Sequence, residues 1–420
     1  MKQLRIEGKH LLQGEIKISG AKNSAVALIP ASILSDGIVT IDNIPNISDI
    51  DALNEILEYL GAKVDWKDSQ IKIDSSSIQN REIPENISKK LRASYYFMAA
   101  LLGKYKKVEM YFPGGCSIGA RPIDQTLKAF HSLGATIIEK DNKYTITAEK
   151  LIGTDIALDM PSVGATINTM LVATKASGKT KIYNAAKEPE IVSVATFLNN
   201  LGAKIRGAGT SVITVEGVEK LTGGFTEVIP DRIEAGTYII AGALIGKNLK
   251  ISNMIPNHVE SLIEKLKEMN IPLEVGNDYV LVSSCSNPKS VNIKTLGYPG
   301  FPTDLQPPMT TLLTQACGVS ILEETIYENR FRNVPYLNQM GADIKINGQK
   351  IEIHGKRELH GAEVEATDLR AGACMVLAAL VATGTTTVSS IGHVLRGYEN
   401  IIEKLQNVGA KIELIDYNEI

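Results

Sequence analysis

Hydrophobic positions along the chain follow two spacings, one typical of helices and one typical of strands. One segment shows both clearly. An apolar run over 164–176 predicts a buried helix, and 179–184 alternates as a short strand. Residues 190–201 have helical spacing and end at a glycine, which commonly stops a helix. Residues 203–216 then predict a hairpin, so the order of elements is helix, strand, helix, strand, strand.

The same order of elements recurs six times along the 420 residues. Its clearest marker is a glycine, or an asparagine in the fourth copy, at the end of the second helix. The marker residues are Gly61, Gly134, Gly202, Asn270, Gly341 and Gly409, in steps of 73, 68, 68, 71 and 68 residues. A fixed period indicates a repeat architecture. We therefore predict an α/β protein built from six helix-strand-helix-strand-strand repeats.

The N-terminus resembles the last hairpin strand, which the sixth repeat lacks. Residues 4–8 and 213–217 share an alternating apolar pattern that ends in glutamate and glycine. We therefore expect a discontinuous three-repeat domain, 1–21 plus 230–420, that encloses a continuous three-repeat domain, 22–229. The chain would cross twice between the domains. We expect the active site in the cleft between them, because such clefts are favoured places for ligands.

Composition narrows the class of protein. A formal net charge of −3 gives no basic surface for nucleic acid or for an anionic membrane, and no apolar run reaches the ~20 residues of a membrane span. The first residues alternate like a strand and lack the apolar core of a signal peptide. The four cysteines form no CxxC pair and the six histidines show no metal-ligand spacing, so we expect neither a disulfide framework nor a metal site. These features favour the reducing cytoplasm.

Unusual residues collect at two places in the repeat, and the first is the start of the leading helix. A helix N-terminus carries unpaired N–H groups and a partial positive charge, so it attracts anions. The residues at this place include Lys22, Asn23, Arg92, Ser162, Val163, Gly164, Arg232, Asp304 and Arg370. Helix capping explains the serine and part of the role of the aspartate. It does not explain the cations, which oppose the helix dipole, so we expect an anion near them.

The second place lies between the first strand and the second helix of a repeat. In the second repeat this segment is a glycine-rich loop that holds Cys116, Arg121 and Pro122. Glycine lets a ligand approach the backbone, and arginine offers a planar fork for phosphate or carboxylate. The alternative is an ordinary turn with a buried cysteine. Arg330 and Arg396 occupy the same place in the fifth and sixth repeats, which favours a functional loop.

Asp304 stands where a helix is expected to begin, directly after residues 299–303, a segment that contains two prolines. A carboxylate among cations is normally ionised. It can accept a proton from a substrate hydroxyl or orient the substrate. The alternative role for this residue is a helix cap.

Eight motifs stand in order along the chain, at 20–25, the Cys116 loop, 161–166, 230–234, 301–304, 328–331, 368–372 and 396–399. Together they strongly resemble the UDP-N-acetylglucosamine 1-carboxyvinyltransferases, a family of enolpyruvyl transferases. The resemblance implies two domains of three repeats each, with helices packed inside, known as an inside-out α/β barrel.

The resemblance also implies a reaction. Phosphoenolpyruvate would donate its enolpyruvyl group to the 3′-hydroxyl of UDP-N-acetylglucosamine with loss of phosphate, the first committed step of peptidoglycan synthesis. The route is addition followed by elimination through a tetrahedral ketal, without a metal or another cofactor. Both substrates are anions, which would account for the cations.

Site residues are carried over from the family by position. Phosphoenolpyruvate would contact Lys22, Asn23, Arg121, Arg330, Arg370 and Arg396. The UDP-sugar would contact Asn23, Arg92, Arg121, Pro122, Asp124, Ser162, Val163, Gly164, Asp304 and Ile326. The catalytic residues would be Lys22, Arg396, Asp304 as the base for the hydroxyl, and Cys116 as the general acid that also aids product release. The same thiol makes members of the family targets of the epoxide antibiotic fosfomycin.

Two departures from the family pattern concern nucleotide contact. Gln125 and Thr126 follow Asp124 where members often have Leu-His, and Met160 replaces a lysine of some members. The nearest competing hypothesis is the transferase for shikimate 3-phosphate, which shares the six-repeat fold but lacks the cysteine loop. A second alternative is that Cys116 is a redox sensor, but a sensor would need no arginines in the later repeats. A third is a non-catalytic repeat clamp for nucleic acid, but a clamp should have a basic surface. We expect a monomer that acts on small molecules.

Overall fold

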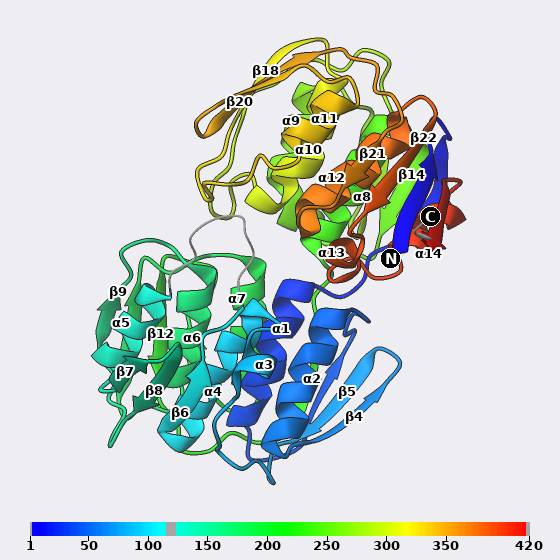
Figure 1. Cartoon of the computed structure of the whole chain (residues 1–420). Helices are drawn as coiled ribbons and strands as arrows, with labels where there is room; N and C mark the ends of the chain where they lie inside the picture. The colour runs from blue at the N-terminus through cyan, green and yellow to red at the C-terminus, as the bar shows by residue number, and fades with distance from the viewer. Residues whose placement is uncertain (1, 115–122, 417–420) are drawn as a thin grey trace. The chain divides into compact units, whose positions relative to one another are not determined.

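The computed structural model describes residues 2–114 and 123–416 (Figure 1). They divide into two compact units, each with a hydrophobic core of its own. One, called the continuous unit here, lies within residues 20–229, and the other, the split unit, comprises 2–19 and 230–416.

The continuous unit contains three successive helix-strand-helix-strand-strand repeats, as the hydrophobic pattern predicts. Its elements are α1 (Lys22–Ala31), η1 (Ser32–Leu34), β3 (Val39–Asp42), α2 (Ser48–Leu60), β4 (Lys63–Lys67), β5 (Gln70–Asp74), α3 (Glu85–Ser88), η2 (Arg92–Tyr95), α4 (Tyr96–Tyr105), β6 (Lys107–Tyr111), α5 (Asp124–Ser132), β7 (Thr136–Lys140), β8 (Lys143–Thr147), β9 (Asp155–Ala157), α6 (Val163–Ala173), β10 (Lys179–Tyr183), α7 (Pro189–Asn200), β11 (Lys204–Arg206), β12 (Val212–Glu216) and β13 (Gly224–Glu227).

The split unit contains the other three repeats, preceded by two N-terminal strands. Its elements are β1 (Lys2–Glu7), β2 (Leu12–Lys17), α8 (Arg232–Ile245), β14 (Gly246–Ser252), η3 (Pro256–Val259), α9 (Glu260–Glu268), β15 (Leu273–Val275), β16 (Tyr279–Val282), β17 (Ile293–Lys294), η4 (Thr303–Leu305), α10 (Gln306–Thr314), β18 (Gly318–Glu323), α11 (Val334–Gln339), β19 (Ile344–Asn347), β20 (Lys350–Gly355), β21 (Glu363–Glu365), α12 (Leu369–Val381), β22 (Thr385–Ser389), α13 (Gly392–Leu395), α14 (Ile401–Asn407) and β23 (Lys411–Asp416).

Each repeat forms one small sheet. In five of the six described sheets a parallel edge strand from a neighbouring segment is added, whereas the sheet of β6, β8 and β7 has only an isolated parallel bridge between Ile83 and Met110. In the third repeat, β9 pairs parallel with β10, and β12 and β11 follow as an antiparallel hairpin. β13, at the end of the continuous unit, returns to pair parallel with β3 of the first repeat. In the split unit, β2 pairs in the same way with β14. β1 lies between β22 and β23, the position of the last hairpin strand in the other repeats.

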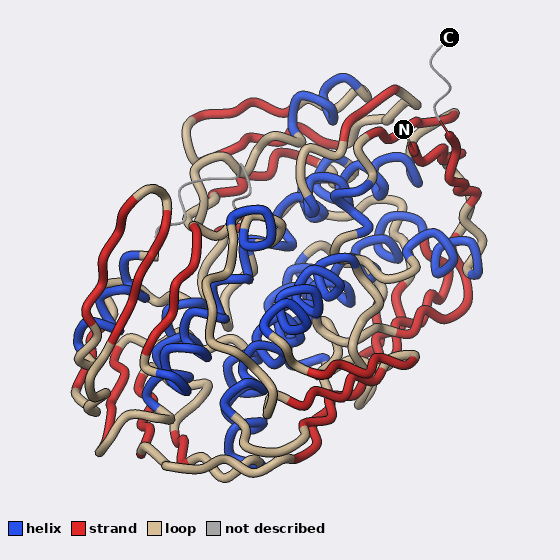
Figure 2. Tube along the Cα trace, turned by 60° about the horizontal axis from the view of Figure 1, so that its bottom comes forward, coloured by secondary structure: helices blue, strands red, loops and turns tan. Residues whose placement is uncertain are grey.

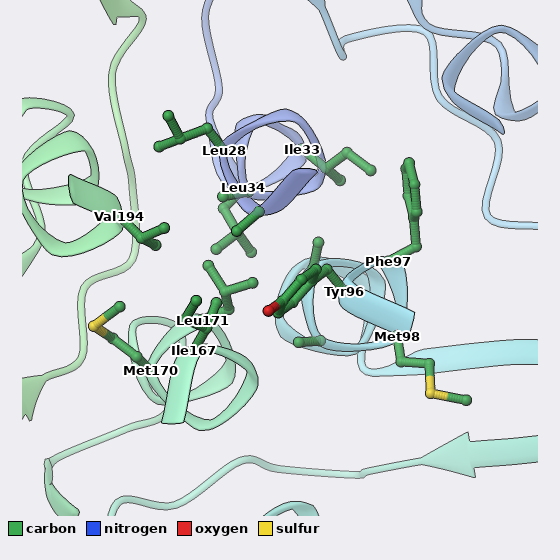
Figure 3. Packing of buried hydrophobic residues seen from close by; sticks show 14 of the residues in the cluster. Leu28, Ile33, Leu34, Tyr96, Phe97, Met98, Ile167, Met170, Leu171 and Val194 are labelled. Carbon is green, nitrogen blue, oxygen red and sulfur yellow. The ribbon is translucent and has the colours of Figure 1, made fainter. Parts of the chain in front are cut away.

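The leading helices of the repeats form the interior of each unit. Residues 370–381 of α12 are all buried, because a helix that is apolar on every side has no face for solvent. α8, α10 and α12 pack against one another, and α4 packs against α1 and α6. Figure 2 shows helices in the middle of each unit and strands at its margin, and Figure 3 shows Leu34, Tyr96 and Leu171 meeting from η1, α4 and α6. No helix among the described residues is both long and apolar enough to cross a membrane.

The marker residue of each repeat ends the second helix with a left-handed backbone conformation. The five glycines at this place have φ angles between 98° and 107°. Asn270 has a φ of 60° at the equivalent place in the fourth repeat. Asparagine tolerates this conformation better than most residues with a side chain. The repeat that looks irregular in sequence therefore keeps the same turn.

Substitution of Asn270 should separate the backbone cost of this turn from side-chain contacts. We expect Asn270→Ala to lower the free energy of unfolding by about 1 kcal/mol, because alanine disfavours a positive φ. Asn270→Gly should stay within about 0.5 kcal/mol of the parent, because glycine adopts this conformation readily. Urea unfolding measures both values. An equal loss in the two variants would mean that an asparagine contact, and not the φ angle, holds the turn.

A buried ion pair joins the start of α8 to the N-terminal segment and to α14. Lys404 Nζ lies 2.6 Å from both Glu234 Oε1 and Ser19 Oγ. Glu234 Oε2 accepts a hydrogen bond from the Ser19 N–H at 2.8 Å, and the Glu234 side chain is 3% exposed. Burial raises the pKa of Glu234 to about 7, and Lys404 opposes this rise. The pair therefore stabilises this region only while the carboxylate keeps its cation.

Loss of the lysine charge should make stability more sensitive to pH. In Lys404→Met the pKa of Glu234 in the folded state should rise further above its ordinary value. The stability that a raised carboxyl pKa gives is complete below the ordinary pKa and is lost as the pH rises through the folded value. We expect the free energy of unfolding to fall by about 3 kcal/mol near pH 8 and by less near pH 6. The double variant with Glu234→Gln should lose this pH dependence, and an equal loss at both pH values in Lys404→Met would contradict the account.

Candidate active site

One carboxylate of the split unit lies between two buried arginines. Asp304 Oδ1 accepts a hydrogen bond from Arg330 at 2.8 Å, and Oδ2 accepts one from Arg370 at 3.1 Å. The arginine side chains are 2% and 5% exposed, whereas the aspartate side chain is 27% exposed. The two guanidinium groups favour the charged form of the carboxylate. The exposed fraction leaves the carboxylate accessible from solvent.

Each of these arginines also faces an aromatic ring, an arrangement that stabilises a cation. Arg330 Cζ lies 5.6 Å from the centre of the Tyr327 ring, and Arg370 Cζ lies 5.3 Å from that of Tyr398. Burial alone would lower the pKa of Arg370, but interactions with Tyr398 and Asp304 raise it above its ordinary value. Arg370 therefore stays positively charged in its buried position.

The cluster is assembled from two leading helices and one loop. Asp304 lies in η4, the short turn before α10, and Arg370 is the second residue of α12. Asp368 caps α12, since its Oδ1 accepts the Arg370 N–H at 2.8 Å. Arg330 comes from the loop between β18 and α11. The N-cap residues of η4 and α10 are Pro302 and Leu305, so the hypothesis that Asp304 is the cap of its helix is wrong.

The guanidinium groups of the cluster have hydrogen-bond donors that the carboxylates do not use up. Asp304 pairs with both arginines, Asp231 also interacts electrostatically with Arg370, and the buried Nε of Arg330 makes no hydrogen bond to the described residues. A buried donor without a partner is unfavourable, and an anionic ligand can supply the partner. The arrangement can therefore bind a phosphate or a carboxylate beside a base that accepts a proton from a hydroxyl.

In the continuous unit, Lys22 forms a close ion pair. Its Nζ lies 2.6 Å from Asp49 Oδ2, with side chains that are 13% and 4% exposed. Lys22 begins α1, and Asp49 lies in the first turn of α2. The protein itself thus supplies an anion near this helix start. Asp49 is not among the residues predicted from the sequence. In the alignment of the repeats it stands close to the positions of Arg330 and Arg396, in the part of the first repeat that corresponds to the Cys116 loop. The repeat alignment could therefore have identified it.

Ser162, Val163 and Gly164 stand at the start of α6, where the repeat pattern predicts them. Ser162 is the N-cap, and its hydroxyl accepts a backbone N–H of the first turn at 3.3 Å. A Cβ atom at Gly164 would lie 1.6 Å from the hydroxyl oxygen of Tyr95, so a larger residue would have to displace the tyrosine side chain. Tyr95 belongs to η2, the turn that begins at Arg92. The start of α6 therefore lies against η2, so the turn that begins at Arg92 and the serine-capped helix start are neighbours.

Gln125 and Met160, two of the residues that depart from the family pattern, lie in neighbouring segments of the continuous unit. Gln125 follows Asp124 at the start of α5, and its Nε2 donates to Asp159 Oδ2 at 2.9 Å. Its Oε1 accepts the Asp159 N–H at 2.8 Å, and Nε2 lies 3.2 Å from Asp124 Oδ2. Met160, the next residue of the same segment, is 61% exposed. Gln125 therefore ties the start of α5 to the segment that enters α6.

The remaining predicted residues are placed by their elements alone. Asn23 is the second residue of α1, Ile326 is 42% exposed in the loop after β18, and Arg396 directly follows α13. The predictions for Cys116, Arg121 and Pro122 lie outside the described residues. Within the described parts of the chain, no three histidine, cysteine or acidic side chains lie close enough together to hold a metal.

The chain is similar to known proteins along almost its whole length. The family model for EPSP synthase (3-phosphoshikimate 1-carboxyvinyltransferase) matches residues 6–405. The UDP-N-acetylglucosamine 1-carboxyvinyltransferase 2 of Bacillus subtilis is 51% identical over 413 residues, which cover 98% of this chain and 96% of that protein. The protein of the same name from Streptococcus thermophilus is 51% identical over 419 residues, 99% of this chain and 100% of its own.

Two solved structures have the same architecture. The enolpyruvyl transferase NikO from Streptomyces tendae has a TM-score of 0.89 and 27% identity, with 98% of each chain covered. EPSP synthase from Acinetobacter baumannii has a TM-score of 0.78 and 17% identity over 99% of this chain and 100% of its own, a likeness of fold alone. The predicted two-domain α/β fold is confirmed. With relatives that share half of its residues over the full length, the chain belongs to the enolpyruvyl transferases, in the family of the UDP-N-acetylglucosamine 1-carboxyvinyltransferases.

Proposed function

We propose that this protein transfers the enolpyruvyl group of phosphoenolpyruvate to the 3′-hydroxyl of UDP-N-acetylglucosamine and releases phosphate, the first committed step of peptidoglycan synthesis. The observation that carries the proposal is the carboxylate of Asp304 between the buried guanidinium groups of Arg330 and Arg370. This arrangement places a base beside a site for an anion. The sequence is also about half identical to those of enzymes named for that reaction.

The proposed chemistry has two steps. In the addition, the 3′ oxygen bonds to C2 of phosphoenolpyruvate, its proton passes to Asp304, and the methylene carbon gains a proton from Cys116. In the elimination, the new methyl group returns a proton to the Cys116 thiolate, the carbon–carbon double bond is restored, and phosphate leaves with the proton that Asp304 had accepted. A general acid or base contributes ~10²–10⁴-fold to such steps. Protons and the leaving group balance without a metal or another cofactor.

The arginines of the cluster have donors to spare for the substrate. A guanidinium group carries five N–H donors. One terminal nitrogen of each arginine donates to Asp304, and Arg370 also has a side-chain hydrogen bond with Tyr398. We propose that the remaining donors bind the phosphate or carboxylate of phosphoenolpyruvate. The other residues proposed to bind this substrate are Lys22, Asn23, Arg121 and Arg396, of which Lys22 and Arg396 also belong to the proposed catalytic set.

The contacts proposed for the UDP-sugar in the continuous unit include the start of α6. The helix start at Ser162, Val163 and Gly164 offers backbone N–H groups to the diphosphate, a common anion site. Arg92 lies in the turn against which this helix start packs. The remaining proposed contacts are Asn23, Arg121, Pro122, Asp124, Asp304 and Ile326.

We further propose that the protein acts as a monomer in the cytoplasm. The three described cysteines, Cys285, Cys317 and Cys374, are all free thiols, which fits a reducing compartment. Burial raises the pKa of Cys374 to about 12, so this thiol is a core residue and not a competitor of Cys116 as a reactive group.

The matching family model is named for the shikimate 3-phosphate reaction, so that substrate is the competing one to test. Purified protein should release phosphate from phosphoenolpyruvate when UDP-N-acetylglucosamine is added and not when shikimate 3-phosphate is added. A coupled phosphate assay measures both rates. Turnover with shikimate 3-phosphate instead would overturn the proposal. Absence of turnover with either, together with tight binding to a macromolecule, would favour a repeat clamp.

Asp304→Asn should lower kcat for the UDP-N-acetylglucosamine reaction by about 100-fold or more, because the amide cannot accept the hydroxyl proton. Asp343→Asn is the matched control, since Asp343 pairs with Arg357 at 2.7 Å on the surface of the same unit. The control should keep the parent kcat. Initial rates at saturating substrate measure the effect. An Asp304→Asn enzyme with the parent kcat would exclude Asp304 as the base.

A further inference from the structure

A fully buried carboxylate outside the proposed catalytic set lies at the end of β18. Glu324 is 0% exposed, and its Oε1 accepts hydrogen bonds from the Thr295 hydroxyl at 2.9 Å and from the N–H groups of Ile326 and Tyr327 at 2.8 and 3.2 Å. Its Oε2 accepts from the Thr303 hydroxyl at 2.9 Å. All four donors are neutral, so hydrogen bonds hold this carboxylate in the interior.

Thr295 extends the same network. Its hydroxyl accepts the Thr325 N–H at 2.9 Å, and its carbonyl oxygen accepts the Thr325 hydroxyl at 2.5 Å. Glu324 and Thr295 thus join three segments: the chain after β17, the start of η4, and the loop after β18. A buried network whose members are all satisfied restricts each segment to one arrangement.

Two of these segments carry the ion pair between Asp304 and Arg330. Thr303, which donates to Glu324, is the residue directly before Asp304 in η4. Tyr327, whose N–H is held by Glu324, faces the guanidinium group of Arg330 with its ring at 5.6 Å. Glu324 therefore constrains the backbone beside both partners of the pair.

We propose that Glu324 is a positioning residue for the transfer reaction. Through Thr303 it sets the direction of the Asp304 carboxylate, and through the loop after β18 it places Arg330 and Ile326. This inference rests on the proposed function, in which Asp304 is the base and Ile326 meets the amino sugar. A reacting group displaced by about 1 Å can slow a reaction by about 100-fold, so the loss of one hydrogen bond in this network should be visible in kcat.

The test compares two substitutions of Thr303, the residue that links Glu324 to the base. Thr303→Val removes the hydroxyl and keeps the shape, and we expect about 10- to 100-fold lower kcat with a KM for UDP-N-acetylglucosamine within about threefold of the parent. Thr303→Ser restores the hydroxyl and should recover kcat to within about threefold. The split between kcat and KM and the rescue by serine are results that a merely structural role would not give.

Thr311→Val is the matched control. It removes a buried hydroxyl from α10, the helix that Asp304 precedes, where Thr311 donates to the Cys374 carbonyl oxygen at 3.2 Å. We expect a similar loss of thermal stability in Thr303→Val and Thr311→Val but an unchanged kcat in the control. Equal kcat values in both variants, close to that of the parent, would overturn the positioning role.

Glu324→Gln examines the carboxylate directly. An amide oxygen can keep the bonds of Oε1, but its NH₂ group then faces Thr303 in place of an acceptor. We expect kcat to fall at least about 10-fold if the variant folds, and Thr303→Val decides the matter if it does not. The parent enzyme is assayed beside all variants. No turnover of UDP-N-acetylglucosamine by the parent would overturn the proposed function and this inference with it, whereas parent-like turnover by Thr303→Val would overturn the inference alone.

Discussion

Burial of the leading helices on every side is the constraint on which the rest of the structure depends. Such a helix has no polar flank, so its ends are the places where it can present N–H groups and charges. In α12 residues 370–381 are all buried, and the site cation Arg370 stands in the first turn. α1 follows the same rule with Lys22, and α6 with its cap Ser162. One element thus supplies both the core of the unit and its chemical groups.

Ion pairs then decide how each helix start is held. Lys22 is paired with Asp49, and Arg370 shares Asp304 with Arg330. A side chain that is held in this way has lost its conformational freedom during folding, so less ordering remains when a ligand binds. The two guanidinium groups beside Asp304 have further N–H donors, which suit a substrate with a phosphate and a carboxylate. Within each unit, fixed partners therefore hold these side chains in place before a ligand arrives.

Local patterns in the sequence predicted most of the fold, because six copies of one unit repeat the same local signals. The apolar runs predicted the buried helices, and the marker residues predicted the turns, including that of Asn270 with its positive φ. Contacts between repeats could not be read in this way. Asp304 and Arg370 come from different repeats, and Glu324 is bonded to three segments, so their meeting depends on how the helices and loops pack. The capping role considered for Asp304 failed for a local reason, since the short turn η4 shifts the caps to neighbouring residues.

Asp304 is, on this account, both the partner of two arginines and the base for the acceptor hydroxyl. A crystal structure of the parent protein with bound UDP-N-acetylglucosamine tests this most directly. We predict a carboxylate oxygen of Asp304 within about 3 Å of the 3′-hydroxyl, with Arg330 and Arg370 still hydrogen bonded to the carboxylate. A 3′-hydroxyl beyond hydrogen-bond reach of Asp304, with another side chain in contact with it, would contradict the account.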